Sequence, residues 1–272
     1  MTDLLCLTVT KDRPHFMPWL VKVFHELHWP WGEKKLMVFV DGPAHPYAKA
    51  MPSGWLDKTL GVVSIHAGFV PASLGDHRQH ALEVACSTAR YDAGLNSTWI
   101  TWMDDDDWRH PHSVRYAMQA AKHLAYSDKI QLVIPRCKRN ALIQLNSGHW
   151  AETSKAIHWY ETLIRADLAL ELEPFMPVSI SEDYYWHQNA VSLAQSKGPE
   201  ATHVEDWPYT AYSSANLIHT NNIAGNAFEN AFEVSVRTGW LFRNGNKEDV
   251  FGSSFPLDSL LALNGGINAR TP

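Results

Sequence analysis

Residues 99–111 read WITWMDDDDWRHP, and this stretch decides the expected fold because an apolar run leads directly into four aspartates, Asp104–Asp107. The apolar run is typical of a buried strand, which favours a parallel sheet covered on both faces. Four adjacent carboxylates repel one another unless a cation or several hydrogen-bond donors compensate them. At the carboxyl end of a buried strand, where α/β proteins bind ligands, we expect that compensator to be Mg²⁺ or Mn²⁺. The alternative is a solvated acidic loop, which would have no need of the flanking Trp102, Met103 and Trp108.

Predicted strands and helices alternate on both sides of this stretch. The predicted strands are residues 4–10, 36–40, 61–67, 99–103 and 130–135. Three helices are predicted: one that begins at Pro14, one at 74–89 and one at 111–126. This alternation predicts an α/β fold, with a Rossmann-related and mostly parallel sheet flanked by helices.

Length and composition limit the class of protein. The chain has 272 residues and a net charge of −6, with 45% hydrophobic and 19% charged residues, which is typical of a globular protein. The acidic excess argues weakly against a protein that coats nucleic acid. No apolar run approaches the roughly 18 residues of a membrane span, and the amino-terminal stretch lacks the features of a signal peptide. The three cysteines form no CxxC pair, so we expect free thiols in a cytoplasmic protein.

Residues 73–85, SLGDHRQHALEVA, together with the aspartate tetrad, resemble the core of family 2-type glycosyltransferases with the GT-A fold. Some members carry S-[IL]-G-x-K-R-N-x-[AL], then a helix, a strand and DDDDW-x-x-P-x-R. This chain departs from that pattern at His77, where Lys is usual, and at Gln79, where Asn is usual. His77 would be cationic only part of the time near neutral pH. The resemblance extends over roughly residues 4–190 and implies a GT-A-like fold with a DxD motif.

The resemblance also implies which residues border a nucleotide-diphosphate sugar. Asp41 matches a carboxylate that accepts a hydrogen bond from the nucleobase, and Arg78 matches a basic residue that faces the base or the diphosphate. A guanidinium suits phosphate through its two parallel donors. The residues implied to contact the donor are Thr10, Arg13, Asp41, Arg78, Asp104 and Asp105.

The metal ion is implied to bind Asp106 and Asp104, although four aspartates in a row leave the register open, so that Asp105 or Asp107 can substitute. A histidine often completes such a metal shell. In PYTAYSSANLIHTNN, residues 208–222, His219 is the best-placed candidate, and His203 is the alternative.

Ser181-Glu182-Asp183 lies about eighty residues after the tetrad, where the family begins a helix with an acidic pair. Asp183 matches the catalytic base, and Glu182 is implied to face the acceptor or to support the loop. An acceptor hydroxyl must lose its proton as it attacks the anomeric carbon, which explains the need for a carboxylate. The alternative is helix capping, with Ser181 as the N-cap and the two acids in the first turn.

Several aromatic and basic residues have two interpretations. Trp19, Trp99 and Trp102 are predicted to lie in the core. Trp108, Trp186 and Trp207 are candidates to line a donor or acceptor pocket, because aromatic faces stack on sugars and on bases. The basic stretch Arg136–Arg139 is predicted either to touch an anionic group or to be a solvated loop.

Taken together, these patterns predict a metal-dependent, inverting glycosyltransferase, where inversion follows from the resemblance alone. The acceptor stays open among a glycan, a small molecule, a protein and a hydroxylated DNA base. One alternative is a nucleotidyltransferase or metal-dependent phosphohydrolase, which the lack of a GxxxxGK[ST] or GxGxxG motif disfavours. Another is a non-catalytic nucleotide-sugar binder, against which the Glu182-Asp183 pair counts.

The predicted domain organisation separates donor binding from acceptor binding. Residues 1–225 would form the GT-A domain, with a nucleotide-sugar-binding half at 1–115 and an acceptor-side half at 116–225. Residues 226–272, with Asn, Gly and Ser clusters, would form a C-terminal extension.

Overall fold

The computed structural model describes residues 2–51, 62–136, 140–144, 150–153, 161–178, 182–206 and 214–218. These residues belong to two compact units of the chain. Unit 1 takes its residues from Met1–Asp105, Pro111–Pro135 and His158–Glu205, and unit 2 from Asp106–His110, Arg136–Ile157 and Asp206–Pro272. The chain therefore passes from unit 1 to unit 2 inside the aspartate tetrad. The predicted division at residue 115 stays a prediction, and residues 226–272 lie outside the described part of the chain.

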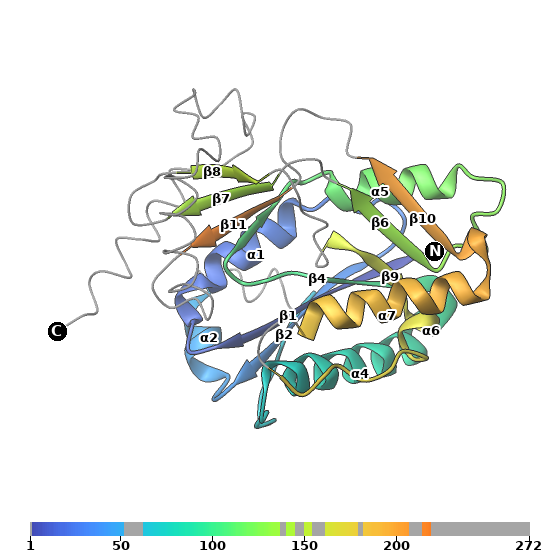
Figure 1. Ribbon diagram of the computed structural model, residues 1–272. Helices are drawn as coiled ribbons and strands as arrows, with labels where there is room; N and C mark the ends of the chain where they lie inside the picture. Colours follow the sequence, from blue (N-terminus) through green and yellow to red (C-terminus); the bar gives the residue numbers. More distant parts are fainter. Residues whose placement is uncertain are drawn as a thin grey trace. The chain divides into compact units, whose positions relative to one another are not determined.

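A seven-stranded, mostly parallel sheet has the order β10-β6-β9-β4-β1-β2-β3 (Figure 1). Strand β1 pairs in parallel with β2 and with β4, and β2 pairs in parallel with β3, whereas the short β9 runs antiparallel to β4 and β6. The strands are β1 (Asp3–Lys11), β2 (Lys34–Asp41), β3 (Val63–His66), β4 (Thr98–Trp102), β6 (Leu132–Arg136), β9 (Leu163–Arg165) and β10 (Thr202–Asp206). The predicted mostly parallel α/β sheet is thus confirmed.

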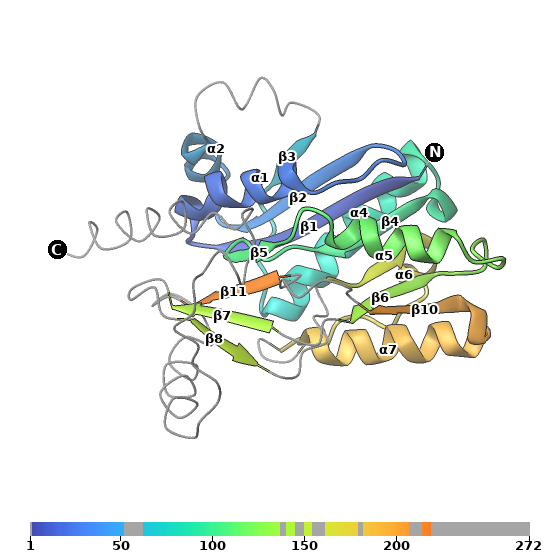
Figure 2. The ribbon, with the colours of Figure 1, turned by 90° about the horizontal axis from the view of Figure 1, so that it is seen from above.

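Helices cover both faces of this sheet, with α4, α6 and α7 on one face and α1 and α5 on the other (Figure 2). The α-helices are α1 (Met17–Glu26), α2 (His45–Ala50), α4 (Leu74–Asp92), α5 (Ser113–Lys122), α6 (Ala166–Ala169) and α7 (Glu182–Lys197). Short 3₁₀ turns occur at η1 (Pro14–Phe16), η2 (Leu95–Ser97) and η4 (Pro199–Ala201). None of the helices in the described residues has the length and hydropathy needed to cross a membrane.

The core between the sheet and α4 is formed by alternate residues of β1 packed against small residues of the helix. Leu5 and Leu7 of β1 belong to one buried cluster with Ala81 and Ala85 of α4. Alternation places successive strand residues on opposite faces, and alanines let the helix backbone approach the sheet closely. The same alternation leaves Cys6 fully buried on the other face of the sheet.

Unit 2 contains a four-stranded sheet of order β5-β11-β7-β8. Its strands are β5 (Asp107–Arg109), β7 (Asn140–Gln144), β8 (Trp150–Thr153) and β11 (Ser214–Ile218). Strand β5 begins with the last aspartate of the tetrad, at a place where no strand was predicted from the sequence. Its partner β11 lies more than a hundred residues away, so no local pattern could have revealed the pairing.

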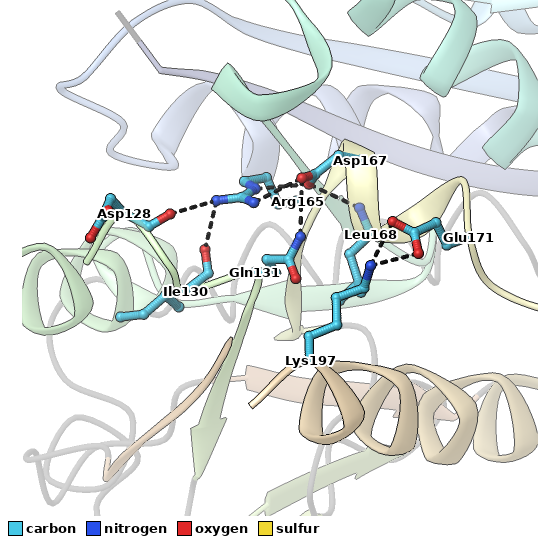
Figure 3. A network of polar contacts seen from close by, with 8 residues as sticks. All are labelled: Asp128, Ile130, Gln131, Arg165, Asp167, Leu168, Glu171 and Lys197. Carbon is cyan, nitrogen blue, oxygen red and sulfur yellow. Dashed lines mark hydrogen bonds and ion pairs between the residues drawn. The ribbon is translucent and has the colours of Figure 1, made fainter. Parts of the chain in front are cut away.

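A polar network holds the short strand β9 in place (Figure 3). The Arg165 guanidinium donates to the carbonyl oxygens of Asp128 and Ile130 at 3.0 and 3.2 Å and pairs with Asp167 at 2.8 Å. The Gln131 side chain donates to the same Asp167 carboxylate at 3.0 Å. Charge-assisted bonds of this kind are stronger than neutral ones, so they compensate for the few backbone pairs that a three-residue strand can form.

Candidate active site

The candidate site begins where three parallel strands end at one edge of the seven-stranded sheet. Lys11 at the end of β1 pairs in register with Asp41 at the end of β2. After β4, the Met103 amide donates to the Leu7 carbonyl at 2.8 Å, and the Thr8 hydroxyl donates to the Met103 carbonyl at 2.6 Å. These bonds continue the ladder past the strand and bring the first tetrad carboxylates to the end of β1.

Asp105 is buried and bound to β1 and to the loop that follows it. Its carboxylate accepts a hydrogen bond from the Thr10 hydroxyl and pairs with the Arg13 guanidinium at 2.9 Å, while the residue is only 1% exposed. The Arg13 amide donates to the hydroxyl of Tyr47 from α2 at 3.3 Å, and burial raises the pKa of Tyr47. Thr10, Arg13 and Asp105, all predicted to border the donor, therefore lie together, and a protein cation compensates the Asp105 charge.

Arg78 of helix α4 links the tetrad to helix α7. Its Nη2 lies 3.3 Å from Asp104 Oδ1, and its Nε lies 3.1 Å from Glu182 Oε1. The guanidinium carbon is 5.1 Å from the centroid of the Trp102 ring, which suits a cation–π contact. Burial opposes the charge of Arg78, but Asp104 and Glu182 outweigh it and raise the pKa of this guanidinium. The cation is therefore permanent.

The two acids at the start of α7 lie in different environments. Glu182 is 3% exposed, and its burial raises the pKa of its carboxyl group despite the nearby Arg78. Asp183 is half-buried, and one of its oxygens accepts a hydrogen bond from the Tyr184 amide at 2.8 Å. Glu182 is thus buried and ion-paired, whereas Asp183 is the more accessible of the two carboxylates. Ser181, the predicted cap, lies outside the described residues.

Asp41 forms an ion pair with Lys11 at 2.6 Å. The negative charge of Asp41 also acts to raise the pKa of His77 in α4. Burial nevertheless lowers the pKa of His77 to about 4. The expectation of a partly charged His77 near neutral pH is therefore wrong, because the desolvation of a 4% exposed imidazole outweighs the attraction of the carboxylate.

Of the metal ligands predicted from sequence, Asp104 and Asp106 belong to the described part of the chain. No group of three His, Cys, Asp or Glu side chains suited to a metal occurs among the residues that the structure describes. Asp106 and Asp107 are buried at 6% and 9% exposure. His203 pairs with Glu205 at 2.9 Å in the edge strand β10, and His219 lies outside the described residues.

Of the tryptophans, Trp19, Trp99 and Trp102 are buried, which confirms their predicted core positions. Trp186 was a candidate for a pocket wall but lies in the core at 2% exposure, because it stacks on Phe175. Trp108 is fully buried, and Trp207 lies outside the described residues.

The stretch Arg136–Arg139 is described only at its first residue. Arg136 forms a two-point ion pair with Asp206 at 2.5 and 2.9 Å. Its guanidinium is thus engaged by a carboxylate, which does not favour the predicted contact with an anionic group.

A cavity of about 410 Å³ lies near the amino ends of the strands, away from these residues. Its lining includes Lys122 and Arg165, but Lys122 donates to the Thr2 hydroxyl at 3.2 Å and Arg165 is paired with Asp167. Ligands of open α/β sheets bind at the carboxyl ends of the strands, so we assign the candidate site to the edge that carries Asp104.

Sequence reasoning missed four contributors to this site. Tyr47 comes from a proline-rich stretch with no distinguishing pattern. Gly75 and Gln79 are part of the stretch that carries the family resemblance, but their contacts, with Val178 and Phe175 respectively, are about a hundred residues away in the chain. Phe175 itself gave no signal.

No protein-family model matches the chain, and no curated protein matches it in sequence. Solved structures do match it in three dimensions. The mannosyltransferase PcManGT from Pyrobaculum calidifontis, in complex with GDP-Man and Mn²⁺, is 11% identical with a TM-score of 0.52, over 99% of this chain and 76% of that one.

The S. aureus protein TarS matches with 14% identity and a TM-score of 0.51, over 96% of this chain and 42% of that one. TarS 1-349 in complex with UDP-GlcNAc matches with 12% identity and a TM-score of 0.50, over 96% of this chain and 71% of that one. At this level of identity the likeness concerns the fold alone. The chain has a GT-A-type fold, with a mixed, mostly parallel seven-stranded sheet and flanking helices.

Proposed function

We propose that the chain is a metal-dependent, inverting glycosyltransferase that moves a sugar from a nucleotide-diphosphate sugar to an acceptor hydroxyl. The observation that carries the proposal is the ion-paired series Asp104, Arg78 and Glu182 at the carboxyl edge of the sheet, directly beside Asp183. Two proteins of similar fold support it, because they were solved with GDP-Man and Mn²⁺ or with UDP-GlcNAc.

The donor would bind along the ends of β1, β2 and β4. In this proposal Asp41 accepts a hydrogen bond from the base, and Arg78 adds positive charge facing the base or the diphosphate. The compensated cluster of Thr10, Arg13 and Asp105 forms the wall beside the nucleotide, and its internal bonds support a rigid surface there. Asp104 would lie near the ribose.

Asp106 and Asp104 are the proposed ligands of Mn²⁺ or Mg²⁺, with His219 as a third candidate. The donor chemistry fits, because hard divalent cations accept one or two carboxylates together with water and substrate phosphates. The Asp104 side chain is 31% exposed, so it is accessible from solvent even though Arg78 binds one of its oxygens. When bound, the ion would neutralise charge on the departing diphosphate.

Asp183 is the proposed general base. The acceptor hydroxyl gives its proton to an Asp183 oxygen while the hydroxyl oxygen forms the new bond to the anomeric carbon. The bond from that carbon to the diphosphate breaks at the same time, and the electron pair leaves with the diphosphate. A single displacement inverts the anomeric centre. Whether the acceptor is a glycan, a small molecule, a protein or a hydroxylated DNA base is left to acceptor screening.

Thermal unfolding with UDP, GDP, UDP-GlcNAc and GDP-Man, each with and without Mn²⁺, tests the proposal. A ligand at a hundred times its Kd adds about 2.7 kcal/mol, and about 2–4 °C per kcal/mol is expected for a chain of this size. One nucleotide series should therefore raise Tm by roughly 5–10 °C, and only with Mn²⁺.

Asp106→Asn should remove the Mn²⁺-dependent rise in Tm, whereas Asp128→Asn, at the opposite end of the sheet, should retain it. The absence of any rise with all four ligands, with and without Mn²⁺, would contradict the proposed donor site.

A further inference from the structure

The first turns of helix α4 hold the chain segment that precedes helix α7. The Gly75 amide donates to the Val178 carbonyl at 2.9 Å, and a Cβ at Gly75 would overlap the carbonyl oxygen of Met176. One turn later, the Gln79 side-chain oxygen accepts a hydrogen bond from the Phe175 amide at 3.1 Å. The segment is thus attached by its backbone, at two points, to one helix.

These contacts share a face of α4 with the Arg78 ion pairs. Residues three and four apart lie on the same side of a helix, so Gly75, Arg78 and Gln79 form one surface, which we call the α4 face. Arg78 joins this face to Glu182, the first residue of α7, and to Asp104 of the tetrad. The face therefore reaches both ends of the proposed reaction centre.

Aromatic packing around Phe175 also stabilises the attachment of this segment. Phe175 stacks on Trp186 of α7, with ring centroids 5.0 Å apart and planes at 4°, and meets Trp102 edge-on at 5.7 Å. Trp102 is the last residue of β4 and carries the Arg78 guanidinium above its ring. The strand before the tetrad, the segment and α7 are thus packed against one another.

We propose that the α4 face is a positioning platform for the acidic start of α7, with Gly75, Arg78 and Gln79 as positioning residues. They would fix Glu182, and through it Asp183, relative to Asp104. A buried glutamate that loses its cation is strongly destabilised, and groups in a reaction centre must be held within about 0.5 Å of the productive geometry. The inference rests on the proposed function for its catalytic meaning, whereas the attachment itself can be measured without activity.

Gln79→Ala tests the attachment, because it removes the acceptor of the Phe175 amide without changing a charge. Hydrogen exchange followed by mass spectrometry should show at least a tenfold loss of protection in peptides covering 175–178 and 182–190. Gln79→Glu, which keeps the acceptor oxygen, should restore most of the protection. The Gln79 side-chain nitrogen also donates to Glu83 at 2.8 Å. Glu83→Ala removes this second hydrogen bond but keeps the one to the Phe175 amide, so it is the control for a more mobile Gln79 side chain.

In steady-state transfer assays, Gln79→Ala should lower kcat by on the order of 10–100-fold and leave the donor KM within about twofold, because misplacement by about 1 Å costs this much. Arg78→Met and Glu182→Gln should each lower kcat, and the double variant should be no worse than the poorer single variant, because the two residues act as one unit.

Unchanged hydrogen exchange in Gln79→Ala would overturn the positioning role, even if transfer by the unmodified protein is established. Additive losses of kcat in the double variant would equally overturn the link through Glu182. Failure of the proposed function has a different signature: the unmodified protein shows no transfer and no nucleotide binding, while the exchange result still reports on the attachment.

Discussion

Two guanidinium groups of the protein compensate two of the tetrad carboxylates. Arg13 pairs with Asp105, and Arg78 pairs with Asp104. Both arginines precede the tetrad and are distant from it in the sequence. The repulsion that predicted a metal is thus relieved in part by two guanidinium groups. A metal at this site would add to that compensation, and its strongest ligand candidate stays Asp106.

Replacement of the proposed base separates catalysis from binding. Asp183→Asn keeps the size of the side chain but removes the proton acceptor, so the transfer rate should fall by about 10²–10⁴-fold. The Mn²⁺-dependent rise in Tm with the nucleotide should persist within about 1 °C, on the scale used above. Tyr185→Phe, an exposed neighbour on the same turn, is the matched control. Loss of nucleotide binding together with transfer would contradict the assigned role.

Two buried histidines predict how stability depends on pH. Burial lowers the pKa of His77 and of His187 to about 4 in the folded protein, whereas an unfolded histidine has a pKa of about 6.5. The unfolded chain binds more protons between these values, so the free energy of unfolding falls as pH drops from about 6.5 to about 4. Each histidine contributes at most about 1.4 kcal/mol per pH unit.

His77→Gln should therefore flatten the pH dependence of unfolding. Urea unfolding at pH 7, 6 and 5 measures the slope, and the exposed His123→Gln variant controls for the loss of a surface histidine. A slope in His77→Gln equal to that of the unmodified protein would show that His77 is not held neutral by folding.

At the scale of elements, we expect the packing of helix α7 against the rest of the protein to depend mainly on one buried aromatic side chain, Trp186. Trp186 is 2% exposed between Phe175 and Trp102, whereas the neighbouring Tyr185 is 47% exposed. Trp186→Ala should lower the free energy of unfolding by about 3–5 kcal/mol, because it removes a large buried side chain and leaves a cavity. Tyr185→Ala should change it by no more than about 0.5 kcal/mol.

Urea unfolding at neutral pH measures both changes. A loss below about 1 kcal/mol for Trp186→Ala would mean that the surrounding side chains collapse into the cavity and that the aromatic packing contributes little.

Elements with a complete local pattern were predictable, and elements defined by distant partners were not. The strands at β1, β2 and β4 are continuous apolar runs, and the structure has them within two residues of the predicted ends. The helix expected at 111–126 is shorter, because regular helix begins only at Ser113 and ends at Lys122. The short β5 and β9 have too few residues for a period, and only their pairing partners define them.

At the scale of the whole molecule, the net charge of −6 includes the four tetrad carboxylates, and without them it is −2 (−6 + 4). Because Arg13 and Arg78 pair with two of these carboxylates, the net charge by itself says little against an anionic acceptor. The tetrad is also where the chain leaves unit 1 for unit 2. The tetrad therefore belongs in part to each unit, a division that the sequence run does not reveal.

The sequence by itself determined the α/β class, the parallel strands and the aspartate tetrad at a strand end, because apolar periodicity and adjacent charges are local properties of a chain. It also identified Arg78, Glu182 and Asp183 as candidates by resemblance. Tertiary structure decided their partners. Arg78 meets Glu182 across 104 positions of sequence, burial lowers the pKa of His77, and Gly75 and Gln79 bind the segment before α7. Ion pairs, desolvation and close packing depend on which surfaces folding brings together, and no short-range pattern encodes that.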